Sequence, residues 1–268
     1  MNEIARHVLR WIEGAIDAAP EGHVPLLFLS GPQGAGKSTA VAEAIAALAL
    51  PVAGASIDDF YLTHLERDML ARKVSPLFLT RGPPGTHDLA LLHDTVETLR
   101  MADAGASTLL PVFDKLADDR RPEPAWRSFH GKPAAIVIEG WLMGVEADPD
   151  AAASAPLNAV EASDLGGDWR RAQEEALGTD YAALWSMADG FLHIVAPGFD
   201  CVRGWRLQQE QALWEARGEA MPEARRGWVD EFIQHYERLT RRMIAGRRRP
   251  GAEIHIDAER RVIRTSGC

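Results

Sequence analysis

Residues 26–48, LLFLSGPQGAGKSTAVAEAIAAL, restrict the possible folds of this chain more than any other segment. They begin with a short apolar run, which is typical of a strand buried on both faces of a parallel sheet. The glycine-rich turn leads into an alanine-rich run, and alanine is the strongest helix former. A buried strand that turns at once into a helix is half of a βαβ unit. The segment therefore predicts an α/β protein with a mostly parallel sheet.

The rest of the chain continues this alternation. Further strands are predicted at VAGASIDDF, AAIVIEGW and DGFLHIVAP, an extended segment at STLLPVFD, and an edge strand or terminal hairpin at AEIHIDAERRVIRTS. Apolar residues at helical spacing predict helices over residues 2–18 and 89–103, the second closed by Gly105, and long charged helices follow within 203–245. We expect one domain over residues 1–268, with an N-terminal helix in 1–20 and a surface insertion at 145–170, where Ala, Asp, Pro and Gly dominate.

Charge and cysteine content narrow the class of protein. A net charge of −10 argues against a protein that coats nucleic acid or an anionic membrane, because both need a basic surface. The run Arg247–Arg249 is interpreted as a solvated helix end. Cys201 and Cys268 provide neither a disulfide framework nor a metal-ligand spacing, and a bridge between them has little in its favour. The N-terminal residues contain no signal peptide or membrane span, so we expect a cytoplasmic protein without nucleic-acid or membrane partners.

The glycine-rich turn carries the strongest chemical signal. Gly31, four residues, then Gly36, Lys37 and Ser38 fit the pattern GxxxxGK[ST], between an apolar strand and a helix as that pattern requires. Such a loop points backbone N–H groups at an anion, the helix N-terminus adds its positive end, the lysine reaches the terminal phosphates, and the serine ligates Mg²⁺. The residues predicted to bind the phosphates of ATP are Gly31, Gln33, Gly34, Ala35, Gly36, Lys37, Ser38 and Thr39.

A phosphate-binding loop alone does not separate a switch or an ATPase from a kinase. A GTPase would need an Asn-Lys-x-Asp element to recognise guanine, yet the asparagines are Asn2 and Asn158, and neither precedes a lysine. The apolar strand AIVIEG ends in Glu139, which fits several classes of nucleotide-binding protein. Other segments must therefore distinguish a kinase from a switch or an ATPase.

Asp58 and Asp59 follow the strand VAGAS, at the edge where parallel sheets bind ligands. If that strand lies beside the strand before the glycine loop, one of these carboxylates lies near the terminal phosphate and can accept the proton of an attacking hydroxyl. Adjacent residues of an extended segment point to opposite sides, so we expect only one of the two carboxylates to accept the proton, and we predict that it is Asp58. The alternative is that the pair caps the next helix.

The order of GPQGAGKST, SIDDFYLT, RGPPGTHDL, LPVFDK, VIEGW and WRLQQE, over about residues 25–240, resembles the P-loop D-glycerate 3-kinase family. That family is similar to the uridine kinase, phosphoribulokinase and pantothenate kinase group. The resemblance implies a three-layer P-loop kinase fold with a helical lid. It also implies ATP- and Mg²⁺-dependent phosphorylation of a small hydroxy acid, D-glycerate, to 3-phosphoglycerate.

The resemblance also implies roles for individual residues. Asp58, Lys37 and the lid residue Arg206 would be catalytic, and Ser38 and Glu139 would hold the metal. The substrate would be bound by Asp59, Tyr61, Arg81, His87, Asp88, Asp114, Lys115 and Arg120. Structural alternatives remain for several of them: Asp88 can cap the helix that follows it, Arg81 can hold its own loop, and Lys115 can form a surface salt bridge.

Two other functions stay open. The acceptor can be a different small alcohol, such as pantothenate, a nucleoside or another hydroxy acid. The chain can also be a nucleotide-binding regulatory protein without an acceptor. The sequence is compatible with a monomer or a homodimer.

Overall fold

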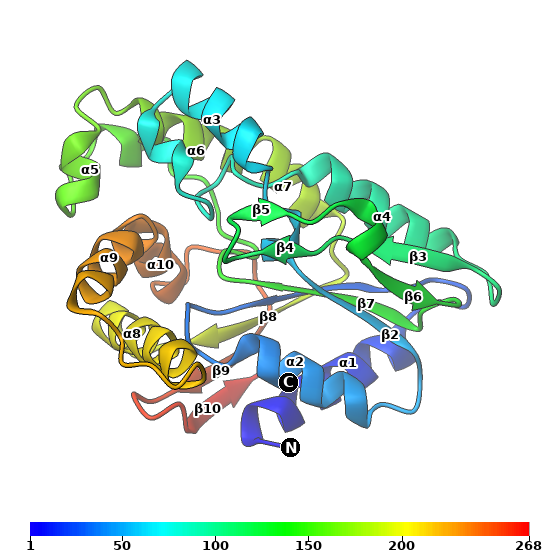
Figure 1. Ribbon diagram of the computed structural model, residues 1–268. Helices are drawn as coiled ribbons and strands as arrows, with labels where there is room; N and C mark the ends of the chain where they lie inside the picture. Colours follow the sequence, from blue (N-terminus) through cyan, green and yellow to red (C-terminus); the bar gives the residue numbers. More distant parts are fainter. Residues whose placement is uncertain (268) are drawn as a thin grey trace.

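Six strands form the central sheet of the computed structural model, which describes residues 1–267 (Figure 1). Their order is β10-β9-β8-β1-β7-β2, and all neighbours are parallel except β10, which pairs antiparallel with β9 as a terminal hairpin. The strands are β1 (Leu26–Ser30), β2 (Val52–Ser56), β7 (Ala135–Gly140), β8 (Gly190–Val195), β9 (Ala252–Ile256) and β10 (Val262–Ser266). The predicted mostly parallel α/β sheet is confirmed.

The alternation of side chains along β1 explains why the sheet is covered on both faces. Leu26 and Phe28 belong to one apolar cluster, and Leu27 and Leu29 belong to the other. The first cluster is completed by α4 (Leu89–Met101), α7 (Asp180–Ser186) and α10 (Glu237–Ile244), and the second by α1 (Glu3–Ala18), α2 (Lys37–Ala47) and α8 (Phe199–Glu215). Figure 1 shows α1 and α2 on the opposite side of the sheet from α4 and α7, which gives the three layers.

Shorter elements surround this frame. They are η1 (Ile57–Phe60), α3 (His64–Lys73), η2 (Pro76–Leu79), β3 (Ser107–Leu110), β4 (Phe113–Asp114), β5 (Asp119–Arg120), η3 (Glu123–Ala125), β6 (Arg127–His130), η4 (Pro149–Ala153), α5 (Ala159–Ser163), α6 (Asp168–Gly178) and α9 (Glu223–Gln234). Among residues 1–267, no helix is both long and apolar enough to cross a bilayer.

Three expectations about local structure were wrong. The strand β2 pairs with β7 and not with β1, so β7 lies between the glycine loop and the two aspartates. Asp58 and Asp59 lie in the 3₁₀ helix η1 and not on an extended segment, because the Ser56 side chain accepts a hydrogen bond from the Asp58 N–H and starts the turn. The helix α4 ends at Met101, before the expected Gly105.

The arginine run at 247–249 also differs from its interpretation as a solvated helix end. Arg248 is buried, donates to the Met243 carbonyl and forms an ion pair of 2.5 Å with Glu253. Three adjacent arginines do not indicate burial from their hydropathy. The partners of Arg248 come from α10 and β9, which are separate from the run in the sequence pattern. Cys268, the expected counterpart of Cys201 in an unlikely bridge, lies outside the described residues, and Cys201 is a free thiol.

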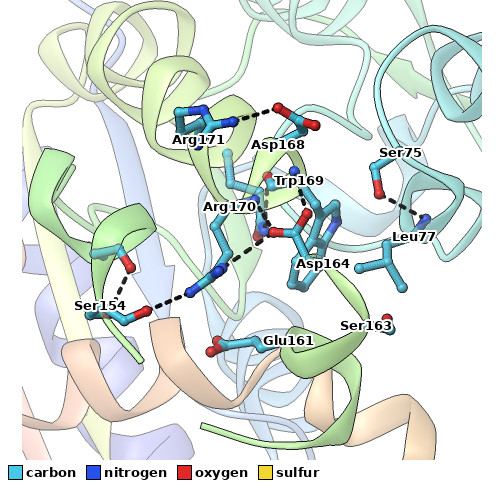
Figure 2. A network of polar contacts seen from close by, with 12 residues as sticks. Ser75, Leu77, Ser154, Glu161, Ser163, Asp164, Asp168, Trp169, Arg170 and Arg171 are labelled. Atoms are coloured by element: carbon cyan, nitrogen blue, oxygen red, sulfur yellow. Dashed lines mark hydrogen bonds and ion pairs between the residues drawn. The ribbon is translucent and has the colours of Figure 1, made fainter. Parts of the chain in front are cut away.

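The stretch predicted as a surface insertion contains η4 and α5, and an ion pair of 2.5 Å between Glu161 and Arg238 joins it to α10. Contacts of Asp164 stabilise the stretch internally. The Asp164 carboxylate accepts hydrogen bonds from the N–H groups of Trp169 and Arg170, at 3.1 and 3.2 Å, and from Arg170 Nε at 3.2 Å (Figure 2). Arg170 also donates to the Ser154 carbonyl at 2.7 Å. Asp164 thus anchors the start of α6 and neutralises a buried guanidinium.

Replacing Asp164 with Ala leaves the buried Arg170 charge without its carboxylate, so we expect a loss of about 3–5 kcal/mol in the free energy of unfolding. The matched control is Asp168→Ala in the same helix, because Asp168 is 62% exposed and pairs with the exposed Arg171. Its loss should stay within about 1 kcal/mol. Urea denaturation of both variants measures the difference, and equal losses would contradict this account of Asp164.

Candidate active site

Three segments meet at the carboxyl edge of the sheet. They are the glycine loop of residues 31–36, η1 and the end of β7. Because β7 pairs with β1 on one side and β2 on the other, Glu139 stands in register with Leu29 and with Ser56. The loop follows β1 and Lys37 is the first residue of α2. Strand pairing therefore gathers the loop, Glu139 and the aspartates of η1, although they come from three separate parts of the sequence.

Lys37, Ser38 and Glu139 form the phosphate side of the site. Ser38 Oγ donates to Glu139 Oε1 at 2.7 Å, and Lys37 Nζ donates to the Pro32 carbonyl at 3.1 Å. Burial lowers the pKa of Lys37, and the charges of Glu139 and Asp58 oppose that shift. The hydroxyl and the carboxylate are the oxygen ligands that Mg²⁺ uses together with phosphate and water. Within residues 1–267 no group of three or more His, Cys, Asp or Glu could hold a metal ion.

Asp58 is held in place by two hydrogen bonds. Lys115 Nζ donates to Asp58 Oδ2 at 2.6 Å, and the Tyr61 hydroxyl donates to Oδ1 at 2.7 Å. Burial alone would raise the pKa of Asp58, but the charge and hydrogen bond of Lys115 and the Tyr61 hydroxyl bring it well below its usual range. Asp58 is therefore ionised at neutral pH. The side chain of Lys115 is 58% exposed, so this contact can be remodelled by a ligand.

All three tyrosines of the chain converge on this region. Besides Tyr61, the Tyr181 hydroxyl contacts His87 Nδ1 at 2.5 Å, and the Tyr236 hydroxyl donates to the Arg81 carbonyl at 2.7 Å. The close approach of Tyr236 requires glycine at position 82, because a Cβ there would lie 2.1 Å from the hydroxyl oxygen. Sequence reasoning missed Tyr181 and Tyr236, and the rarity of tyrosine was the available signal.

His87 is buried with one ring nitrogen unpaired. Tyr181 accepts from the Gly85 N–H at 3.2 Å, so its own proton is free to be donated to His87 Nδ1, which favours the tautomer with a proton on Nε2. His87 Nε2 has no hydrogen-bond partner among residues 1–267. Burial lowers the pKa of His87 to about 4, so the ring is neutral at pH 7. A buried N–H donor without a partner is unfavourable unless a ligand accepts from it.

A buried arginine supports the turn that carries Lys115. Arg67 is 1% exposed and donates to the carbonyls of Leu62, Leu79 and Asp118, at 3.3, 2.6 and 2.6 Å. Its ion pair with Asp118 measures 2.9 Å, and Asp118 also binds Arg81. Arg67 therefore links α3, η2 and the β4–β5 turn. It was not among the expected site residues.

The remaining predicted substrate residues are paired with other groups of the protein. Asp59 accepts from the Phe113 N–H at 3.2 Å and from Arg127 at 3.4 Å, and so faces different partners from Asp58. Asp88 caps α4 through the Leu91 N–H at 3.0 Å and binds Arg120 at 2.9 Å. Asp114 accepts from the N–H groups of its own turn and from Arg121 at 2.9 Å.

The predicted lid residue Arg206 is paired within the helical region. It donates to Glu210 at 2.9 Å, and Arg225 donates to the other oxygen of Glu210 at 2.6 Å. The Arg206 guanidinium also lies 5.9 and 5.5 Å from the ring centroids of Trp228 and Phe232. Arg206 is therefore held within α8 and against the aromatic rings of α9, and its ion pair goes to Glu210 rather than to the glycine loop.

Comparison with known proteins places this geometry in a family. A Schizosaccharomyces pombe protein named uncharacterized kinase mug58 is 30% identical to the chain over 243 residues, which cover 87% of this chain and 85% of the yeast protein. The chain belongs to this family of kinases. A Saccharomyces cerevisiae protein named probable ATP-dependent kinase TDA10 is 28% identical over 241 residues, or 79% of this chain and 76% of the relative.

Solved structures confirm the kinase fold. D-Glycerate 3-kinase from Cryptococcus neoformans var. grubii matches with a TM-score of 0.82 over 100% of both chains, at 22% identity. The expected P-loop kinase fold is therefore confirmed, and the family is one of phosphotransferases. No protein-family model matches the sequence.

The buried His87 gives a pH dependence to stability. Its folded-state pKa of about 4 lies below the ordinary value of 6.5, so the unfolded chain binds more protons between these pH values. The free energy of unfolding should fall as the pH drops from 6.5 towards 4, with His87 contributing up to about 3 kcal/mol. Replacing His87 with Asn should flatten the urea-derived stability profile in this window, whereas His93→Asn, at an exposed position of α4, should not. Parallel profiles for wild type and His87→Asn would contradict this.

Proposed function

We propose that this kinase transfers the γ-phosphoryl group of ATP to a hydroxyl of D-glycerate and forms 3-phosphoglycerate. The observation that carries the proposal is the position of Asp58. Its carboxylate lies across from the Lys37, Ser38 and Glu139 group and is close enough for its charge to act on Lys37. A carboxylate in this position can orient an acceptor hydroxyl towards the terminal phosphate, as transfer to an alcohol requires.

The contacts support the following roles. The backbone of residues 31–39 and Lys37 would bind the phosphates, and Ser38 with Glu139 would hold a Mg²⁺ ion, which neutralises phosphate charge when bound. Asp58 accepts a hydrogen bond from the acceptor hydroxyl and takes its proton as the oxygen–phosphorus bond forms and the bond to the β-phosphate oxygen breaks. Because its pKa is low, Asp58 acts chiefly by orienting the hydroxyl, and it receives the proton late in the reaction.

The acceptor subsite is suited to a small hydroxy acid. Lys115 supplies positive charge at Asp58, and Arg81 lies close enough for its charge to act on Lys115. His87 Nε2 is a buried donor without a partner in the described part of the chain. A carboxylate of the acceptor can accept from Lys115 or Arg81, and a hydroxyl or carboxylate oxygen from His87. The name of the Cryptococcus neoformans structure supports glycerate as the acid. Pantothenate or a nucleoside would place a larger group in this charged space.

Replacing Asp58 with Asn should lower turnover at least about a hundredfold, because the amide keeps the size of the side chain and cannot take the proton. Coupled ADP release measures the rate. The control is Asp68→Asn, which alters a carboxylate on α3 that pairs with Arg72. An unchanged rate in Asp58→Asn would move the role to Asp59.

The acceptor is identified by the same assay with D-glycerate, L-glycerate, pantothenate and uridine, and the product by ³¹P NMR. We expect D-glycerate alone to accelerate ADP release, with a phosphomonoester on its terminal carbon. Acceleration by pantothenate or uridine instead would replace glycerate by that acceptor. Slow ATP hydrolysis that no alcohol stimulates would support a regulatory nucleotide-binding protein.

A further inference from the structure

The C-terminal hairpin reaches the glycine loop through one side chain. Arg260 lies in the turn between β9 and β10, and its Nε donates to the Gly34 carbonyl at 2.6 Å. Its Nη2 donates to Gln208 Oε1 of α8 at 3.0 Å, and its guanidinium lies 5.1 Å from the Trp205 ring centroid. The side chain therefore joins the loop, α8 and the hairpin. Gly34 and Arg260 are 226 residues apart in the sequence.

The contact with the Gly34 carbonyl controls the direction of a neighbouring N–H group. A trans peptide is planar, so its carbonyl and its N–H point in opposite directions. With the Gly34 carbonyl held by Arg260, the Ala35 N–H points across the loop and donates to the Pro32 carbonyl, with nitrogen and oxygen 3.3 Å apart. Rotation of this peptide would turn the N–H away from a phosphate, and Arg260 opposes that rotation.

The opposite side of Gly34 is closed by α8. Gly34 has a φ of +75°, and a Cβ there would lie 2.5 Å from Trp205 Cβ and 2.9 Å from the Trp205 carbonyl carbon. Trp205 is itself tied to the hairpin, because its Nε1 donates to the Ala258 carbonyl at 2.8 Å. Gly34 thus contacts both α8 and Arg260, so this predicted lid helix packs directly on the phosphate loop.

The backbone of Arg260 indicates that the position is specialised. Its φ is +64°, and it is one of two non-glycine residues with positive φ in the described chain. The left-handed region is unfavourable for a residue with a Cβ, with Asn tolerated best after Gly. The turn is closed by hydrogen bonds of 3.0 Å between Asp257 and Arg261 and between Arg260 and Asp257. A long cationic side chain at a place suited to Gly or Asn is explained by its contact with the loop.

We propose that Arg260 is a positioning residue for nucleotide binding: it holds the Gly34–Ala35 peptide in the orientation that presents the Ala35 N–H to a phosphate, and it couples that orientation to α8. The inference rests on the proposed function only in that the loop binds the phosphates of a nucleotide. It does not depend on which alcohol receives the phosphoryl group.

The test uses three variants of the full chain and measures Mg·ATP binding by calorimetry. Arg260→Asn keeps a residue that tolerates positive φ and removes the guanidinium, and Arg260→Lys keeps one charged donor. Arg261→Ala is the matched control, because Arg261 lies in the same turn but pairs with Asp257 and Glu259 and is 72% exposed.

We expect ATP affinity to fall about tenfold in Arg260→Asn, as the loss of a charged hydrogen bond predicts, and less in Arg260→Lys. Arg261→Ala should bind ATP as wild type does. In steady state the Asn variant should raise KM for ATP tenfold and leave kcat and KM for the acceptor within twofold, a split that general destabilisation would not produce.

Wild-type affinity in Arg260→Asn, or an equal loss in Arg261→Ala, would overturn the assignment. Should Arg260→Asn fail to fold, Arg260→Lys decides the matter, since an ATP affinity equal to that of wild type in the Lys variant would refute the need for the planar guanidinium. If wild-type protein itself does not bind Mg·ATP, the proposed function fails, and this outcome differs from the loss of affinity in one variant only.

Discussion

The pairing of β7 with both β1 and β2 is the constraint on which the site depends. Parallel strands all end at the same edge of a sheet, so the residue that follows each strand arrives at one place. Here β1 leads into the glycine loop, β7 ends at Glu139 and Gly140, and β2 leads into η1 with Asp58. The central strand also sets the separation, because Glu139 lies between the phosphate loop and the carboxylate. In the proposed reaction, the acceptor would approach the phosphate from the side of Asp58.

Charge balance is the second condition for this site. Several carboxylates lie close together, and each has a cation from the segment 81–127. The pairs are Asp58–Lys115, Asp59–Arg127, Asp88–Arg120, Asp114–Arg121 and Asp118–Arg81. Exposed pairs such as Asp114–Arg121 contribute little to stability, but they prevent repulsion between neighbouring carboxylates. In the proposed reaction, an anionic acceptor would compete for these cations, among them Lys115, whose side chain is 58% exposed.

The sequence predicted the phosphate side of the site better than the proposed acceptor subsite around Asp58. The glycine loop, Lys37 and Ser38 are contiguous, and their spacing alone indicates their chemistry. Glu139 was recognisable as the end of an apolar strand. Tyr181, Tyr236 and Arg67 were missed because each acts through contacts with distant segments. The expectation that Asp58 and Asp59 point to different sides agrees with their separate hydrogen-bond partners. The reason given for it was wrong, because both residues lie in a 3₁₀ turn and not in an extended strand.

The sequence by itself determined the βα unit with its phosphate loop, the buried strands and the pair of acidic residues, Asp58 and Asp59, that follows β2. Such features depend on residues that are close in the sequence, because the local pattern of apolar residues and glycines determines them. Only the tertiary structure decided that β7 separates β1 from β2, that the three tyrosines meet at one site, and that the C-terminal hairpin contacts Gly34. These depend on which apolar faces pack together over long sequence separations, and packing of that kind is a property of the whole chain.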